Sequence, residues 1–325
     1  MTSAKTGLVL AHDLESLVYQ PVPLVEDFLY QHTVTMWASD PGTGKSVLAT
    51  QLAISLSSGT PVFGVLEVPK PVPVYYLQLE GHYAEFIQRM RYMRQVVPIT
   101  PDHLCWDSTA HLNVLRDDHV NSLIKRIEEW WQVPALIVID PIYMAVSGGL
   151  SKDEPSSAFV RFSSILRETF GAAILLIHHT HKPIYQNGKM VEEDDPSYGS
   201  QWLKAHVDVN YILKKSGADH EGVTFYNKKA RGANVYKCLA LTYHPETYTC
   251  SVDLKAKEGK ALIRVLAFLD ECRKQNRSTT FAEIASTVGV SHAHLRRLQG
   301  DSELTNHVEF ITINGHKTLW KPVSP

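Results

Sequence analysis

The sequence predicts an α/β protein with a mostly parallel sheet, followed by a small, separate C-terminal unit. The stretch 31–38 is rich in β-branched and apolar residues, and a glycine-bearing loop and a helix-forming run at 47–56 follow it. Further along the chain, apolar strand patterns alternate with amphipathic helix patterns. Such alternation is typical of a parallel sheet with right-handed crossovers. After residue 255 the pattern changes to short helices and a hairpin.

The composition is that of a globular protein, with 44% hydrophobic and 20% charged residues among 325. This length accommodates one large domain and one small one. No apolar run is long enough to cross a membrane, and the N-terminus lacks the layout of a signal peptide, so we expect a soluble cytoplasmic protein without a membrane partner. The four scattered cysteines indicate neither a zinc ribbon nor a disulfide framework.

The chain is expected to open with a flexible lead over residues 1–22. Residues 23–29 are apolar at helix-like spacing, and we expect them to pack against the core or against a neighbouring subunit. The first core strand then covers 31–38. The sequence does not choose between the two packing partners.

The loop after this strand reads Ser39-Asp40-Pro41-Gly42-Thr43-Gly44-Lys45-Ser46. A strand, a glycine-bearing turn and a helix that opens on Gly-Lys-Ser form the context of a phosphate-binding loop. The usual pattern begins with glycine, and here Ser39 takes that place. An ordinary turn before a buried helix is the alternative. We expect a nucleotide to be bound by Asp40, Pro41, Gly42, Thr43, Gly44, Lys45 and Ser46.

Within this loop the side chains have distinct expected tasks. Lys45 is placed to reach the β- and γ-phosphates, and the Ser46 hydroxyl can bind Mg²⁺. Gly42 and Gly44 let the backbone turn its N–H groups toward the phosphates. Mg²⁺ is therefore expected together with the nucleotide.

Two later strands end in carboxylates. The strand 74–79 ends at Glu80, and the continuous apolar run 135–140 ends at Asp140, as expected of a central strand covered on both faces. We assign Asp140 to the Mg²⁺ shell. Pro141 follows it and cannot orient a water molecule, so Glu80 is the best candidate for activating water. A solvated charge at a strand end is the alternative for Glu80.

The remaining elements of the large domain follow the same alternation. Helices are expected at 82–97, 117–131 and 156–169, and strands at 104–106 and 172–178. The segments 207–213, 223–228, 235–244 and 248–252 alternate in the manner of antiparallel strands that extend the sheet. We place the boundaries of this domain at 23–254.

Together these features resemble the RecA-fold ATPases, and in particular the RepA-like plasmid replicative helicases and their DnaB-like relatives. The resemblance covers roughly residues 20–255 and includes the polar cluster His178-His179-Thr180-His181-Lys182 after the strand 172–178. It implies ATP as the nucleotide, Glu80 as the catalytic base and His179 as the sensor of the γ-phosphate. A metal site is the alternative for the histidines, but neighbours on a strand end point in alternating directions.

The resemblance also implies contacts with DNA and with other subunits. In the family, the loop at 182–197 lines a central pore and contacts single-stranded DNA, which makes Lys182 and Lys189 candidate contacts. A mobile surface loop is the alternative, since four acidic residues accompany the lysines. Lys229 and Arg231 match a Lys-x-Arg-Gly arrangement that reaches into the neighbouring subunit's nucleotide site, and a solvated basic turn is the alternative. A homo-oligomeric ring, such as a hexamer, follows from this.

The C-terminal domain, 255–325, has the pattern of a winged helix. Thr280-Phe281-Ala282-Glu283 is a capping box that opens its second helix, and Asn314-Gly315 is a hairpin turn signal. In a DNA-binding winged helix, the third helix would turn His292, His294, Arg296 and Arg297 toward duplex DNA. Many domains of this shape bind proteins instead. The net charge of −2 requires any DNA-binding surface to be local.

The function expected from this resemblance is that of an ATP-dependent DNA helicase or translocase in the replication of a plasmid, phage or mobile element. A RecA- or RadA-like recombination ATPase and an ATP-switched DNA-binding regulator are the alternatives. A helicase separates strands and is stimulated by single strands. A recombinase pairs homologous strands, and a regulator binds one duplex site tightly and hydrolyses ATP slowly.

Overall fold

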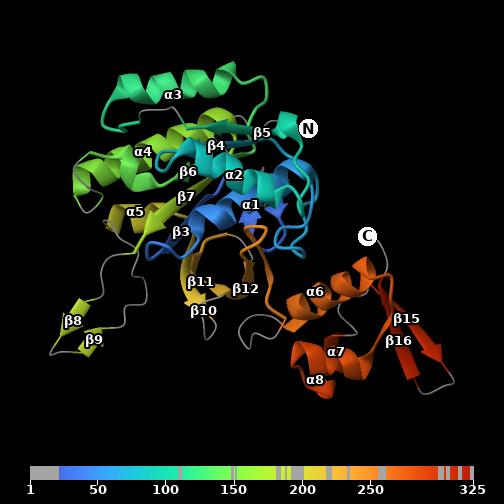
Figure 1. Ribbon diagram of the computed structural model, residues 1–325. Coiled ribbons are helices and arrows are strands. Elements are labelled where there is room, and N and C mark those ends of the chain that lie inside the picture. Colours follow the sequence, from blue (N-terminus) through green and yellow to red (C-terminus); the bar gives the residue numbers. More distant parts are fainter. Residues whose placement is uncertain are drawn as a thin grey trace, which may run out of the picture.

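A nine-stranded mixed sheet runs through the larger part of the molecule, and three helices with a three-stranded sheet form a C-terminal unit (Figure 1). The computed structural model describes residues 22–108, 112–147, 150, 152–180, 184–186, 189–191, 201–216, 222–232, 235–254, 261–298, 304, 308–313 and 317–322. The expected lead at 1–22 lies, apart from its last residue, outside the described residues. Among the helices in the described part of the chain, none is long and apolar enough to span a membrane.

The helices are α1 Lys45–Ser58, α2 Tyr83–Met93, α3 Asp117–Glu129, α4 Asp153–Phe170, α5 Gln201–His206, α6 Ala261–Lys274, α7 Phe281–Val288 and α8 His292–Leu298. Strands of the main sheet are β3 Val34–Ser39, β4 Val74–Gln78, β5 Leu104–Asp107, β6 Leu136–Asp140, β7 Ala173–His179, β10 Val209–Ser216, β11 Gly222–Ala230, β12 Cys238–His244 and β13 Thr249–Val252. The smaller sheets contain β1 Pro23–Val25, β2 Leu29–Tyr30, β8 Ile184–Gln186, β9 Lys189–Val191, β14 Thr279–Thr280, β15 Val308–Ile313 and β16 Lys317–Pro322.

The strand order β13-β12-β11-β10-β3-β7-β6-β4-β5 places β3, which carries the phosphate loop, near the middle of the sheet. β3, β7, β6, β4 and β5 are parallel, as predicted. The expected antiparallel extension is present from β11 to β13. β10 differs from the prediction on one side, because it pairs with β3 in parallel and only with β11 in antiparallel orientation.

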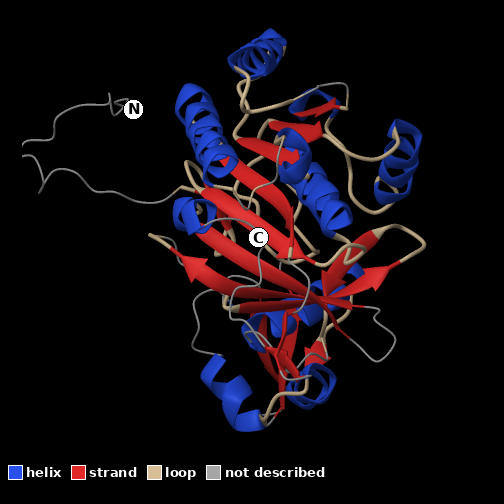
Figure 2. Cartoon of the chain, turned by 90° about the vertical axis from the view of Figure 1, so that its left-hand side faces the viewer, coloured by secondary structure: helices blue, strands red, loops and turns tan. Residues whose placement is uncertain are grey.

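Helices cover both faces of the parallel part of the sheet (Figure 2). Alternate residues of each strand point to opposite faces, so every central strand contributes to two apolar clusters. Leu48, Leu52 and Leu56 of α1 pack on one face. α3, α4 and α5 pack on the other, for example through Leu123 and Phe162. The carboxyl ends of β3, β4, β6 and β7 therefore meet at one edge of this layered core, beside the start of α1.

The prediction of helix-like packing at residues 23–29 is wrong. β1 and β2 form a two-stranded antiparallel ribbon there. Its Phe28 side chain is 1% exposed and contacts the rings of Trp37, Tyr211 and Phe225. The apolar residues of this ribbon and its turn thus pack against the core of their own chain, which was one of the two expected packing partners. Asp27 makes that turn with a positive φ of 51°.

In the C-terminal unit, α6, α7 and α8 pack with a sheet of order β14-β16-β15 around the buried Trp320. The predicted capping box is present in part, since the Thr280 hydroxyl accepts a hydrogen bond from Glu283 N at 3.2 Å. The Glu283 carboxylate instead accepts from Arg277 and Thr279. α6 also reaches the large domain, because Ile263 belongs to its main apolar cluster.

Candidate active site

The phosphate loop occupies the turn between β3 and α1. Gly42 and Gly44 have positive φ angles of 73° and 98°. A side chain at either position would strain this backbone, which is why both are glycine. α1 begins directly after Gly44 and ends at Gly59, which caps it in the left-handed conformation. The N-terminus of this helix therefore faces the loop and favours an anionic ligand there.

Lys45 is 6% exposed and is held by its own loop. Its Nζ donates to Ser39 O at 2.9 Å, Ser39 Oγ at 2.8 Å and Asp40 O at 3.1 Å. Ser39, which replaces the usual glycine, thus adds an acceptor for the lysine. Burial lowers the pKa of Lys45 to about 8, against the opposing charges of Asp140, Asp40 and Glu80.

Asp140 lies at the end of β6 and is 5% exposed. The Tyr76 hydroxyl from β4 donates to Asp140 Oδ2 at 2.5 Å. Burial raises the pKa of Asp140, and hydrogen bonds from Tyr76 and Ser46 together with the charges of Lys45 and Arg89 oppose the rise. Since one oxygen faces Tyr76, the carboxylate has a fixed orientation beside the helix start.

Glu80 and His179 complete the group at the strand ends. Lys45 Nζ lies 3.3 Å from His179 Nδ1. Burial and the charge of Lys45 lower the pKa of His179, so its ring is neutral near pH 7 and can accept a hydrogen bond. Tyr143, in the turn after Asp140, packs against the His179 ring at 5.2 Å, and its pKa is raised by burial and by a hydrogen bond to Glu80.

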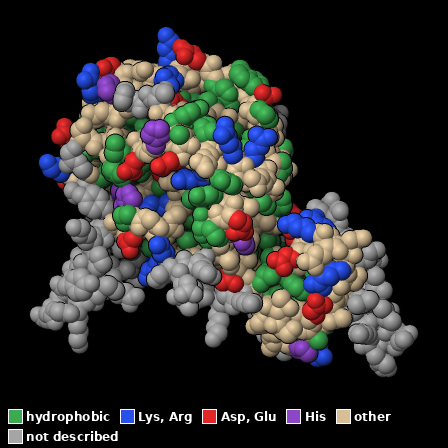
Figure 3. Space-filling view, in the orientation of Figure 1, with side chains coloured by type: hydrophobic (Ala, Val, Ile, Leu, Met, Phe, Trp, Pro, Cys, Tyr) green, Lys and Arg blue, Asp and Glu red, His purple; other side chains and the backbone are tan. Residues whose placement is uncertain are grey.

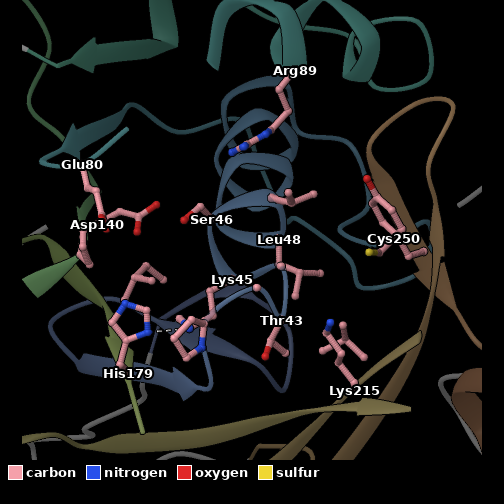
Figure 4. A pocket seen from close by; sticks show the side chains of 18 of the residues that line it. Thr43, Lys45, Ser46, Leu48, Glu80, Arg89, Asp140, His179, Lys215 and Cys250 are labelled. Carbon is pink, nitrogen blue, oxygen red and sulfur yellow. Dashed lines mark hydrogen bonds between the residues drawn. The ribbon is translucent and has the colours of Figure 1, made fainter. Parts of the chain in front are cut away.

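These groups line one cavity of about 790 Å³ (Figure 4). It extends from Glu80 and Asp140, past the phosphate loop, to Lys215 and Cys250 on the antiparallel extension of the sheet. The structure therefore brings together all the predicted nucleotide and metal residues except Asp40, whose carboxylate does not line the cavity and accepts a hydrogen bond from the Thr180 hydroxyl after β7. This size and this mixture of charged and apolar walls suit a nucleotide.

Three residues of the site escape sequence reasoning. Arg89 of α2 lines the cavity, and its buried Nε has no hydrogen-bond partner among the described residues. Tyr76 and Tyr143 orient the two carboxylates, as described above. In the sequence, Arg89 is only one of several arginines on an amphipathic helix, and both tyrosines lie within apolar stretches. No spacing in the sequence marks them.

The oxygen donors at the start of α1 fit a magnesium ion. Ser46 and Asp140 offer a hydroxyl and a carboxylate, which are hard ligands of the kind that Mg²⁺ prefers. Within the described residues, no group of three histidine, cysteine, aspartate or glutamate side chains is arranged to hold a metal ion. A Mg²⁺ ion here would therefore need further oxygens from nucleotide and water, as is usual for this ion.

Lys229 and Arg231 lie away from this cavity, at the end of β11. Lys229 Nζ donates to Lys204 O at 2.7 Å and Ala205 O at 2.9 Å, and Arg231 donates to Ala205 O at 3.2 Å. Both cations thus bind the last carbonyls of α5. Asp208 anchors this region to the sheet, because its Oδ2 accepts from Val34 N at 2.9 Å.

The predicted DNA contacts are described only in part. Lys182 lies outside the described residues, and of Lys189 the structure describes only its place in β9. His292 and Arg296 are exposed on α8, whereas the side chains of His294 and Arg297 are not described. Of the two described side chains, neither His292 nor Arg296 lines the cavity of the phosphate loop.

Comparison with known proteins supports the fold. A family model described as an AAA domain (AAA_25) matches residues 2–183. No curated protein matches the chain in sequence. Among solved structures, the chain is similar to an isolated ATPase domain, with 14% identity and a TM-score of 0.54 over 74% of this chain and 95% of that one.

Two further structures are similar at 14% identity. A DnaB-like replicative helicase has a TM-score of 0.53 over 74% of this chain and 66% of its own. The KaiC-like protein PH0186 from Pyrococcus horikoshii OT3 has a TM-score of 0.49 over 71% of this chain and 93% of its own. The family match covers more than half of the 325 residues. The chain therefore belongs to the AAA domain family, and its sheet has the RecA-like fold of a P-loop ATPase.

Proposed function

We propose that this chain is an ATP-driven DNA helicase or translocase, which acts as a homo-oligomeric ring, such as a hexamer, in the replication of a plasmid, phage or mobile element. One observation carries the proposal: the start of α1 and the ends of three strands bring Lys45, Asp140, Glu80 and His179 to one cavity. This set supplies a cation for the phosphates, a carboxylate for a metal ion and a carboxylate that can orient water, which are the groups that one subunit contributes to hydrolysis of a phosphoanhydride. The similarity to a DnaB-like replicative helicase supports the choice of a DNA motor.

In this proposal, Lys45 and the backbone N–H groups of the loop bind the β- and γ-phosphates. Ser46 and Asp140 would hold Mg²⁺, which neutralises phosphate charge when it is bound. Glu80 orients the attacking water, and the Tyr143 hydroxyl keeps its carboxylate in place. His179 accepts a hydrogen bond from Lys45 in the structure and is close enough to contact the same γ-phosphate.

Lys229 and Arg231 are proposed to act on the nucleotide of the neighbouring subunit. A cation that meets the transferring phosphoryl group stabilises the charge that develops there. Their position at the end of β11, apart from the cavity of their own chain, is consistent with such a role. Hydrolysis would then depend on assembly.

We propose that DNA contacts two parts of the chain. Single strands would contact the segment 182–197 through Lys182 and Lys189. The C-terminal unit, which we propose to be a winged-helix domain over 255–325 beside an ATPase core over 23–254, would present α8 to duplex DNA. The face in Figure 3 shows lysine and arginine interspersed with acidic side chains, so this face offers no broad basic surface to DNA.

Unwinding of a forked DNA duplex tests this function. The protein with ATP and Mg²⁺ should separate the strands, and single-stranded DNA should stimulate its ATPase activity. Lys45→Ala should show neither activity, because it removes the cation that faces the phosphates. Pairing of homologous strands without unwinding would indicate a recombinase instead, and tight binding of one duplex site with slow hydrolysis would indicate a regulator.

A further inference from the structure

The cavity of the phosphate loop has a second end, formed by the antiparallel extension of the sheet. Val223 of β11, Tyr243 of β12 and Cys250 of β13 line it there, opposite Val47 and Leu48 of α1. These side chains present apolar and aromatic surface, whereas the catalytic groups at the other end are charged. We call the surface of Val223, Tyr243 and Cys250 the far wall (its Cys250 is labelled in Figure 4).

A single side chain joins the far wall to the helix of the phosphate loop. Gln51 Nε2 of α1 donates to Cys250 O at 2.8 Å, and Cys250 N donates to Gln51 Oε1 at 2.7 Å. Gln51 is 3% exposed, and 199 positions separate the two residues. These are the two bonds that a neighbouring strand would make with Cys250. The amide of Gln51 therefore takes the place of a partner strand at the outer edge of β13.

The hydrogen bonds between Gln51 and Cys250 also determine the position of Tyr243. Tyr243 and Cys250 are directly opposite each other on β12 and β13. Because the backbone groups of Cys250 point toward Gln51, the two residues form a pair without mutual backbone hydrogen bonds, the kind in which side chains are closest. Both side chains line the cavity. Moving β13 away from Gln51 would thus move Tyr243 and Cys250 away from α1 together.

We propose that the far wall is the nucleobase subsite and that Gln51 is the residue that positions it. The inference rests on the proposed binding of ATP at the phosphate loop. A triphosphate held by Lys45 leaves its nucleoside to the opposite end of the same cavity. There the Tyr243 ring offers a stacking face, and Val223 and Cys250 offer apolar contacts, which suits a flat purine.

Comparison of two ligands separates the ends of the cavity. ATP occupies both ends, whereas inorganic tripolyphosphate has no base and reports on the phosphate end alone. Titration calorimetry with Mg²⁺ on the full chain gives both dissociation constants. Gln51→Leu keeps an apolar stem but removes both hydrogen bonds to Cys250. We expect its affinity for ATP to fall about tenfold and its affinity for tripolyphosphate to change less than about twofold.

Tyr243 provides a second test that leaves the Gln51 pair intact. Tyr243→Ala should lose affinity for ATP and keep its affinity for tripolyphosphate, while Tyr243→Phe should bind both like the wild type. Tyr92→Ala is the matched control, since the Tyr92 ring packs against Tyr248 and neither ring lines the cavity of the phosphate loop. It should leave both affinities unchanged.

The titrations with ATP and tripolyphosphate distinguish failure of this inference from failure of the ATPase proposal. Equal losses for both ligands in Gln51→Leu and Tyr243→Ala, or unchanged binding of ATP, would overturn this inference while leaving the ATPase proposal intact. A wild-type protein that binds neither ligand would overturn both. Thermal unfolding without ligand shows whether Gln51→Leu is folded. If it is not, the comparison of Tyr243→Ala with Tyr243→Phe decides the question.

Discussion

Lys45 is the residue whose surroundings have the most direct consequence for binding. Its ammonium lies among backbone carbonyls and next to a neutral histidine, in a site from which water is largely excluded. The folded-state pKa of about 8 is below the ordinary value of 10.5, so the proton is lost as the pH rises through about 8. A phosphate ligand favours the charged form and raises this pKa again.

We therefore expect the affinity for ATP to be constant between pH 7 and 7.5 and to fall above pH 8. Far above that value the loss should approach about tenfold per pH unit, since binding must then take up one proton. Calorimetry at pH 8.5 in two buffers of different ionisation enthalpy measures this uptake. Lys45→Arg, whose guanidinium stays charged, is the control and should take up no proton at this site. An affinity that is flat up to pH 9.5 would contradict the expectation.

Only some residues of the site can be predicted from the sequence. The phosphate loop is predicted from its spacing, and Glu80 and Asp140 from their places at the ends of apolar strands. Tyr76, Arg89 and Gln51 meet the site only because distant elements pack together. Gln51 leaves one signal, as an amide within the mostly apolar helix run 47–56, but its partner on β13 cannot be read from that run.

At the scale of elements, helices and strands of the parallel core are close to their predicted ranges because their periodic patterns are long. The helix-like prediction fails at the ribbon of β1 and β2, because both strands are too short to show the strand period, while their apolar residues are spaced as on one face of a helix. The partners of β10 also escape prediction. A strand pattern shows which residues are buried and leaves open which neighbour will pair with it in parallel.

α3 is attached to the edge strand β5 by an ion pair between a half-exposed arginine and a buried carboxylate, and this attachment is testable. Arg126 donates to Asp107 at 2.7 and 2.9 Å, and Tyr75 donates to the same carboxylate at 2.7 Å. Arg126→Met would leave a buried carboxylate with less support. We expect the free energy of unfolding to fall by about 2 kcal/mol, because water reaches the half-exposed arginine and reduces the cost below that of a fully buried pair.

Urea denaturation followed by circular dichroism measures this loss. Arg116→Met is the matched control, because Arg116 pairs with Asp118 on the surface, where both side chains are more than half exposed. It should leave stability unchanged within error. A loss of similar size in both variants would mean that the Asp107 pair contributes no more than a surface contact.

For the whole molecule, the first question is whether the large domain works without the C-terminal unit. We expect a chain that ends at residue 254 to fold and hydrolyse ATP but to bind duplex DNA more weakly. Its melting temperature should also fall, since Ile263 and Ala267 of α6 belong to the main apolar cluster. ATPase assays and anisotropy with labelled duplex measure the two activities. Unchanged affinity for duplex DNA would assign the C-terminal unit to protein binding.

The second question is whether neighbouring subunits share an active site. Glu80→Gln should bind ATP without hydrolysing it, because the amide keeps the packing and loses the orientation of water. Arg231→Ala should also bind ATP, and we expect hydrolysis to fall about a thousandfold if Arg231 acts as known arginine fingers do. Mixed under conditions of subunit exchange, the two variants should recover activity at junctions where Arg231→Ala holds ATP and Glu80→Gln supplies the arginine.

Steady-state ATPase activity across mixing ratios measures this complementation. A bell-shaped recovery supports the shared site. Activity that stays at the level of the separate variants at every ratio would place Arg231 outside the active site or require coordination of the complete ring. Lys45→Ala mixed with Glu80→Gln is the control, since neither variant has an intact site to offer.

The contacts of Lys229 and Arg231 with α5 have a consequence for how such a ring would be controlled. A cation that binds the carbonyls of a helix of its own chain has fewer N–H donors left for a phosphate on another chain. In each subunit, Lys229 and Arg231 would thus stay hydrogen-bonded to the carbonyls of α5. The nucleotide of the neighbouring subunit would have to compete with these carbonyls for the two side chains.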